Sequence, residues 1–197
     1  LGKVPEGLPA IFGEAWEGPT DAELAAMKVQ VDFVGVNYYT RAVVHDDPRS
    51  FPVMERRTFQ RNATYTETGW EVYPDGLYDV LTWVRRRYGS VPLYVTENGA
   101  AFYDPPVADV PVLADPLRVG YLGAHLRAVR RAIADGVDVR GYFVWSLLDN
   151  LEWAHGFRKR FGIVHVDFAT QKRTPKASAR FYAEVIRTNG AILRLGT

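Results

Sequence analysis

Three stretches of the chain combine apolar, β-branched and aromatic residues in runs of strand length. They cover residues 31–39, 91–99 and 141–148, and each carries its polar residues at or just beyond its C-terminal end. A strand whose two faces are covered by helices is apolar almost throughout. The pattern therefore predicts three buried strands with their polar residues at the same end.

Other stretches carry apolar residues at intervals of three and four, as on one face of a helix. Thr20 is a capping residue directly before the first of these stretches, and Gly89 is a typical stop at the end of the second. The predicted helices cover residues 21–29, 74–89, 115–136 and 175–186.

Three further stretches show neither the apolar runs of the predicted strands nor the spacing of the predicted helices. Residues 1–20 contain three prolines and predict a loop. Residues 40–70 predict a long excursion that includes a hairpin, and long structured loops usually serve a site. Residues 191–195 predict a short edge strand.

The alternation of helices and strands predicts a parallel sheet with right-handed crossovers. Three strands cannot close a barrel, which takes about eight strands and about 250 residues. A barrel therefore requires that its first strands lie outside this chain. An open doubly wound sheet is the alternative, but the chain has neither G-x-G-x-x-G nor G-x-x-x-x-G-K-[ST] to cradle a phosphate.

Composition narrows the classes of partner. The 197 residues are 47% hydrophobic and carry 24 Lys and Arg against 23 Asp and Glu, a formal net charge of +1. No single-sign field attracts nucleic acid or an anionic membrane, so we expect neither as a partner. The chain has no cysteine and no histidine pair with zinc spacing, so we expect no cofactor, no metal site and a cytoplasmic location.

Glu97 is the first candidate for a catalytic group. It ends the run V-P-L-Y-V-T-E-N-G, and the C-terminal tip of a buried strand is where barrels and open α/β sheets carry their chemistry. The structural alternative is a solvent-facing glutamate or a helix-capping acid.

Taken together, the ends of the three predicted strands and the loop just beyond the last one carry carboxylates, amides and indoles. Sugars suit this mixture, because a pyranose ring stacks on an indole and its hydroxyl groups bond to carboxylates and amides. A phenol beside a carboxylate also holds the attacking oxygen in place. The residues concerned are Asn37, Tyr39, Glu97, Asn98, Trp145, Glu152 and Trp153.

Five ordered motifs resemble the second half of the family 1 glycoside hydrolases, the retaining β-glucosidases and β-galactosidases. They are D-F-V-G-V-N-Y-Y-T, T-E-T-G-W-E-V-Y-P-D-G-L, Y-V-T-E-N-G, G-Y-F-V-W-S-L-L-D-N-L-E-W and R-F-G-I-V-H-V-D. The resemblance extends from about residue 7 to residue 192. It implies a (β/α)8 TIM barrel.

The resemblance also implies a role for each matched position. Glu97 matches the nucleophile that forms a covalent glycosyl-enzyme, and Tyr39 matches the phenol bonded to it. The other matched positions bind the substrate: Asn37 near the 2-hydroxyl, Trp145 as a stacking platform, Glu152 at the 4- and 6-hydroxyls, Trp153 near the 3-hydroxyl, Phe161 in the same pocket and Trp70 on the aglycone side.

The second carboxyl group of the reaction has no counterpart here. Retaining glycosidases need two carboxyl groups about 5 to 5.5 Å apart. The resemblance implies that the acid/base glutamate lies upstream in an N-E-P motif, and this sequence contains none. We therefore expect residues 1–197 to form the C-terminal part of one barrel domain, about three βα units, that works with an N-terminal half-barrel polypeptide.

Two other interpretations concern residues of the last loop. Glu152 could be the acid, but its place beside Trp153 favours recognition of hydroxyl groups. A phosphorylated sugar is disfavoured because Glu152 would repel its phosphate. Lys159 and Arg160 are then expected in a solvated loop or a structural pair.

The predicted activity is hydrolysis of β-glucosides and related β-glycosides by double displacement, with the acid/base supplied by the missing half. A non-catalytic sugar-binding or scaffold fragment is the alternative, because half of the catalytic machinery is absent from this sequence.

Overall fold

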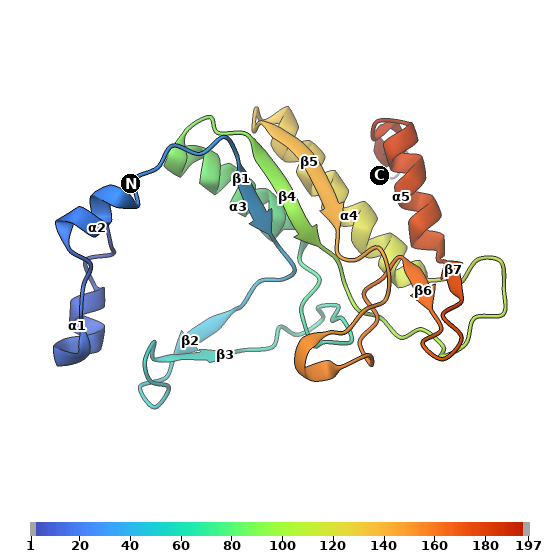
Figure 1. Ribbon diagram of the computed structural model, residues 1–197, viewed down its shortest axis with the longest axis horizontal. Helices are drawn as coiled ribbons and strands as arrows, with labels where there is room; N and C mark the ends of the chain where they lie inside the picture. The colour runs from blue at the N-terminus through green and yellow to red at the C-terminus, as the bar shows by residue number, and fades with distance from the viewer. Residues whose placement is uncertain (1–2, 195–197) are drawn as a thin grey trace. The chain divides into compact units, whose positions relative to one another are not determined.

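The computed structural model describes residues 3–194, which fall into two compact units (Figure 1). The first unit comprises residues up to 32 together with residues 42–61. The second comprises residues 33–41 and the chain from residue 62 onward.

The first unit contains short helices and one hairpin. The capping box between Thr20 and Glu23 explains where one helix starts, because each side chain bonds the other residue's backbone N–H. The predicted loop over residues 1–20 is wrong for residues 8–15, where Pro9 suits a first helical turn. The hairpin expected within residues 40–70 is confirmed. The elements are α1 Leu8–Phe12, η1 Gly13–Ala15, α2 Asp21–Ala26 and the antiparallel strands β2 Val44–Asp46 and β3 Glu55–Arg57.

A three-stranded parallel sheet forms the centre of the second unit. Its strands are β1 (Val34–Asn37), β4 (Leu93–Asn98) and β5 (Val139–Val144), in the order β1-β4-β5. The predicted parallel sheet is therefore confirmed. The three strands run side by side in Figure 1, so their C-terminal ends meet at one edge.

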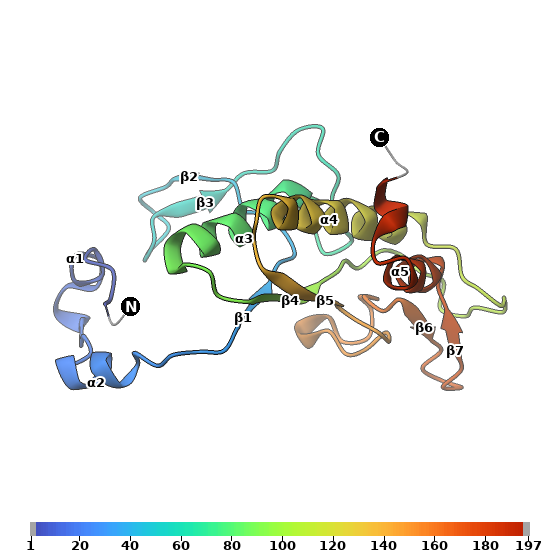
Figure 2. The same ribbon diagram turned by 90° about the horizontal axis from the view of Figure 1, so that it is seen from above.

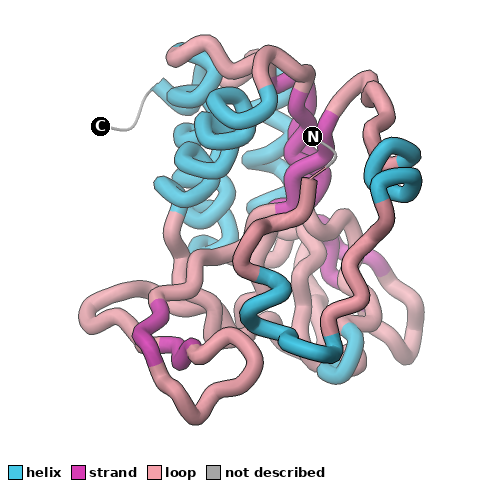
Figure 3. The backbone as a smooth tube through the Cα atoms, turned by 90° about the vertical axis from the view of Figure 1, so that its left-hand side faces the viewer, coloured by secondary structure: helices cyan, strands magenta, loops and turns pink. Residues whose placement is uncertain are grey.

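Two helices cover one face of this sheet (Figure 2). They are α3 (Pro74–Tyr88) and α4 (Pro116–Ala134), and α5 (Ala177–Arg187) lies next to α4. Figure 3 shows the strands, in magenta, beside the layer of helices, in cyan. The three helices agree with the predicted ones to within a few residues.

Apolar side chains join the helices to the sheet. Leu77 and Leu81 of α3 are fully buried against Val36 of β1 and Val95 of β4. Each such side chain stabilises the fold by about 1.5–3 kcal/mol relative to an exposed one. A second cluster, which includes Leu122 of α4, joins α4 to α5.

The second unit also contains elements that the sequence pattern did not predict. A hairpin of β6 (Val164–Val166) and β7 (Arg173–Pro175) has strands of only three residues, too short for a clear alternation. The edge strand expected over residues 191–195 is wrong, since η3 (Ala191–Arg194) is a 3-10 helix and residue 195 lies outside the described residues. Within residues 3–194, every helix is too short or too polar to span a membrane.

His125 makes the stability of this core depend on pH. Its ring is fully buried in α4, with Nδ1 2.8 Å from the Tyr121 carbonyl oxygen, and burial lowers its pKa from 6.5 to about 4. The unfolded chain therefore takes up a proton at this position near pH 6.5, whereas the folded chain does not. Full stability is present above pH 6.5, and part of it is lost as the pH falls toward 4.

We expect the free energy of unfolding to fall by about 3 kcal/mol between pH 7 and pH 4 because of this histidine, at about 1.4 kcal/mol per pKa unit. The His125→Gln variant should lack that component, because an amide does not titrate. Urea unfolding at both pH values measures it, with His155→Gln at an exposed position as the control. Equal pH dependence in wild type and His125→Gln would contradict the assignment.

Candidate active site

Strand pairing brings Tyr39 and Glu97 to the same edge of the sheet. Asn37 of β1 is opposite Glu97 of β4, after a register shift that follows Val36. The ladder continues one residue beyond β1, where the Tyr38 N–H donates to the Glu97 carbonyl oxygen at 2.9 Å. Tyr39 therefore leaves the sheet directly beside the carboxylate.

The phenol of Tyr39 donates a hydrogen bond of 2.6 Å to Oε2 of Glu97. Burial, this hydrogen bond and the nearby carboxylates of Glu97 and Glu152 raise the pKa of Tyr39 well above its ordinary value. The phenol consequently stays protonated and remains a donor. The bond fixes one oxygen of Glu97 and leaves the other available.

An aromatic cavity of about 320 Å³ surrounds this pair. The rings of Tyr39 and Trp70 lie 5.3 Å apart, and Phe161 lies 5.9 Å from Trp70 and 6.2 Å from Tyr39. These three rings support one another as a continuous wall. The cavity is lined by Tyr39, Trp70, Glu97, Trp145, Glu152, Trp153 and Phe161.

Seven of the eight residues to which the resemblance gives a role therefore meet in one cavity. The eighth, Asn37, does not line it, although it ends β1 at the same edge of the sheet. Its side-chain oxygen accepts a hydrogen bond of 2.6 Å from the Thr96 hydroxyl, and the residue is exposed. Within residues 3–194, no cluster of three acidic or histidine side chains could hold a metal ion.

Gly99 allows Trp145 to approach the end of β4. The Trp145 N–H donates to the Asn98 carbonyl oxygen at 3.0 Å, which continues the β4–β5 pairing beyond β5. A Cβ atom on Gly99 would lie 1.7 Å from the Trp145 carbonyl oxygen. The glycine in T-E-N-G is therefore required by close packing of two strand ends.

Asp149 closes the loop that carries Glu152 and Trp153. Its carboxylate accepts from Nη1 of Arg160 at 2.8 Å and from the backbone N–H of Gly162 at 3.0 Å. These bonds join the two ends of the loop, on either side of Phe161. The tip stays open to solvent, and Trp153 there is 85% exposed.

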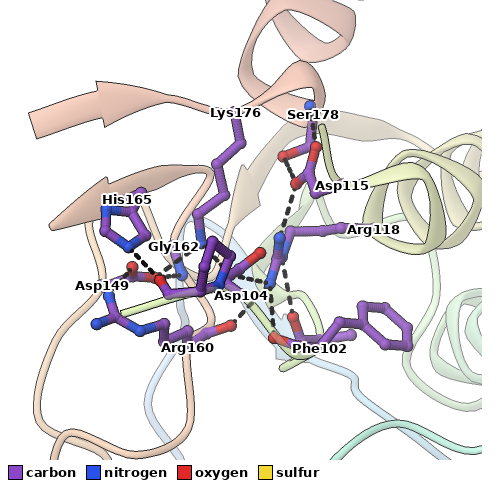
Figure 4. Close-up of polar contacts among 12 residues, drawn as sticks. Phe102, Asp104, Asp115, Arg118, Asp149, Arg160, Gly162, His165, Lys176 and Ser178 are labelled. Atoms are coloured by element: carbon purple, nitrogen blue, oxygen red, sulfur yellow. Dashed lines mark hydrogen bonds and ion pairs between the residues drawn. The ribbon is translucent and has the colours of Figure 1, made fainter. Parts of the chain in front are cut away.

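A cluster of six buried charges, which we call the rim network, extends this closure (Figure 4). Nζ of Lys176 lies 2.9 Å from Asp149 and 2.6 Å from Asp104, and burial lowers the pKa of this ammonium. Arg118 bonds Asp104 at 3.0 Å and Asp115 at 2.7 Å. With Arg160, three cations therefore balance three anions.

The rim network joins the loops that follow β4 and β5. Arg118 also donates to the Arg160 carbonyl oxygen at 2.8 Å, and Ser178 at the start of α5 bonds Asp115. Sequence reasoning did not find this network, because it joins three separate stretches of the chain, residues 104–118, residues 149–160 and Lys176. For Lys159 and Arg160 the sequence left open a solvated loop or a structural pair. Both residues are paired: Arg160 bonds Asp149, and Lys159 lies 3.1 Å from a Glu67 oxygen.

Comparison with known proteins agrees with this geometry. The family model of Glycosyl hydrolase family 1 matches residues 11–191. The chain belongs to this family. The residues that the family model matches make up most of the chain, in agreement with the extent of the five motifs.

Individual relatives give the same result. The chain is 48% identical over 169 residues to 1,4-beta-D-glucan glucohydrolase of Thermotoga neapolitana and 45% identical over 193 residues to Thermostable beta-glucosidase B of Thermobispora bispora. These matches cover 85% and 96% of this chain but only 37% and 40% of the relatives. The chain spans about two-fifths of the length of these curated relatives.

A solved structure of a family 1 β-glucosidase from Thermotoga maritima superposes with a TM-score of 0.88 at 42% identity. The superposition covers 96% of this chain and 42% of that one. The predicted fold class, part of a (β/α)8 barrel, is therefore confirmed. The described residues contain three strands of such a barrel in the order expected for consecutive units.

Substitution of Gly99 by alanine should displace Trp145. Because the new Cβ overlaps backbone, we expect a loss of about 1–3 kcal/mol in the free energy of unfolding, as for overpacked cores. Gly120→Ala is the matched control. Nothing lies within 4 Å of its added Cβ in α4, so it should stabilise the chain by up to about 1 kcal/mol. Urea unfolding measures both, and equal effects would contradict the packing argument.

Removal of the Lys176 cation should strongly destabilise the second unit. In Lys176→Met, Asp104 and Asp149 keep their arginines, but the buried cluster carries one uncompensated negative charge. We expect a loss of about 3–5 kcal/mol in the free energy of unfolding. Lys172→Met, which breaks an exposed pair with Asp109, should cost less than about 1 kcal/mol. Equal losses in urea unfolding would refute the role of the rim network.

Proposed function

We propose that this chain takes part in the hydrolysis of β-glucosides and related β-glycosides with retention of configuration. The observation that carries the proposal is the Tyr39–Glu97 hydrogen bond of 2.6 Å inside an aromatic cavity. A carboxylate that is held by a phenol and lines a cavity of aromatic rings suits attack on a sugar. Membership of the family supports the same reaction.

In the proposed mechanism, the free oxygen of Glu97 attacks the anomeric carbon as the glycosidic bond breaks. A covalent glycosyl-enzyme forms, and the leaving-group oxygen takes a proton from a general acid. Water then attacks the same carbon from the opposite face and gives a proton back to that group. Glu97 leaves as a carboxylate, and two inversions give overall retention.

The cavity walls supply the recognition of the sugar in this proposal. Trp145 offers a face on which a pyranose ring stacks, and Glu152 accepts hydrogen bonds from the 4- and 6-hydroxyls. Trp153 donates near the 3-hydroxyl, while Phe161 packs in the same pocket and Trp70 lies toward the aglycone. Asn37 does not line the cavity itself, and we propose that it contacts the region of the 2-hydroxyl from the same edge of the sheet.

The general acid/base is proposed to come from outside this sequence. A retaining mechanism places the second carboxyl group about 5 to 5.5 Å from the first, and the chain has no N-E-P motif. We propose that residues 1–197 contribute to one barrel domain whose remaining strands, with the acid/base glutamate, belong to an N-terminal half-barrel polypeptide.

Glu97→Gln should abolish both covalent labelling and turnover. The test uses this chain assembled with a polypeptide that supplies the remaining strands, such as the part of the Thermotoga maritima β-glucosidase that this chain does not cover. An activated 2-fluoro β-glucoside should add one fluorosugar to Glu97, detected by mass spectrometry of peptides. Loss of the nucleophile should lower turnover by more than about 10³-fold.

Glu184→Gln is the control, because Glu184 is a partly exposed residue of α5 that pairs with Arg187 and lies outside the cavity. It should label and turn over like wild type. Wild-type assembly that binds the glucoside reversibly without gaining mass would instead favour the non-catalytic sugar-binding alternative. Full turnover in Glu97→Gln would refute the nucleophile assignment.

A further inference from the structure

We infer that Asn98 and Tyr121 are positioning residues, which hold the backbone of Tyr39 so that its phenol stays on Glu97. The inference rests on the proposed function. It gives a role to Asn98, which the sequence placed among the strand-end candidates without one, and to Tyr121, which the sequence did not connect with the site. Both lie behind the cavity, and neither lines it.

Asn98 connects the end of β4 to the chain that leaves β1. Its side chain is fully buried, and Nδ2 donates to the Tyr38 carbonyl oxygen at 2.6 Å and to the Tyr121 hydroxyl at 3.1 Å. The Tyr142 hydroxyl of β5 donates to its Oδ1 at 2.5 Å. The side-chain amide is therefore bonded at both ends and has one defined orientation.

Tyr121 continues this chain of hydrogen bonds from α4. Its hydroxyl accepts from Asn98 and donates to the Tyr39 carbonyl oxygen at 3.0 Å. The residue is 2% exposed, and its ring stacks on His125 with centroids 3.9 Å apart. The packing leaves this ring little freedom, so its hydroxyl is a fixed point.

Side chains thus hold the carbonyl groups of two consecutive residues, Tyr38 and Tyr39, at the point where the pairing of β1 with β4 ends. The last ladder bond reaches Tyr38, and Tyr39 follows outside the sheet. Asn98 directly follows Glu97, and successive side chains of a strand point to opposite faces. The end of β4 therefore places Glu97 on one face of the sheet. On the other face it places Asn98, which holds the segment that carries Tyr39.

Loss of Asn98 or Tyr121 should lower the rate at which Glu97 attacks the sugar more than it lowers the affinity for the sugar. Reacting groups displaced by about 1 Å can lose about a hundredfold in rate, because attack needs a defined geometry. Neither Asn98 nor Tyr121 touches the cavity, so their loss should leave sugar contacts in place. If a residue only stabilised the fold, its loss would lower the amount of assembled protein. The assembled molecules would still react at the wild-type rate and bind the sugar with the wild-type affinity.

The test measures covalent labelling of Glu97 in the assembled barrel. Labelling by 2,4-dinitrophenyl 2-deoxy-2-fluoro-β-glucoside gives a maximal rate constant and an inhibitor affinity. We expect Tyr121→Phe to lower the rate constant about tenfold or more and to leave the affinity within about twofold. Asn98→Ser, the second variant, should behave in the same way, because serine is too short to reach both partners.

Tyr182→Phe is the matched control, because the Tyr182 hydroxyl also donates to a backbone carbonyl, that of Tyr142, at 2.7 Å. It should label like wild type. A wild-type rate constant in both Tyr121→Phe and Asn98→Ser would overturn the inference and leave the proposed function intact. If neither variant assembled, Asn98 and Tyr121 would have a purely structural role, and the inference would also be overturned. Absence of label in wild type would refute the proposed function itself.

Discussion

Six buried charges hold the edge of this sheet in place. Lys176 lies between Asp104 and Asp149, and Arg118 and Arg160 complete the pairing with the same loops. Burying a charge is costly unless it is paired and hydrogen-bonded. The balance of three cations and three anions meets that requirement. The rim network joins the loop after β4 to the loop after β5, and this holds the side chains that line the aromatic cavity in place.

Parallel pairing of β1 and β4 decides the chemistry inside these walls. Two strands that run side by side place Tyr39 and Glu97 at the same edge, although the two residues are 58 positions apart in the sequence. The phenol then fixes one carboxylate oxygen. The buried amide of Asn98 fixes the segment that carries the phenol, so the front of the site depends on contacts made behind it.

Sequence patterns identified the parts of the fold whose stability depends on regular burial. The three strands are apolar runs of strand length, and the helices α3, α4 and α5 carry apolar residues at intervals of three and four, so both kinds of element are visible in the sequence. Short elements lack that signal. Residues 8–15 were expected in a loop, η3 was expected as a strand, and the three-residue strands β6 and β7 were not expected at all.

The sequence by itself determined the residue types available at the strand ends and, through five motifs, the family. It placed Glu97 at the tip of a strand because this acid ends an apolar run rich in β-branched and aromatic residues. Only the tertiary structure decided which oxygen Tyr39 bonds, that Gly99 admits the Trp145 carbonyl, and that Asp149 pairs with Lys176 and Arg160. These contacts join residues far apart along the chain, and no local pattern of hydrophobic and polar positions encodes a pairing in space.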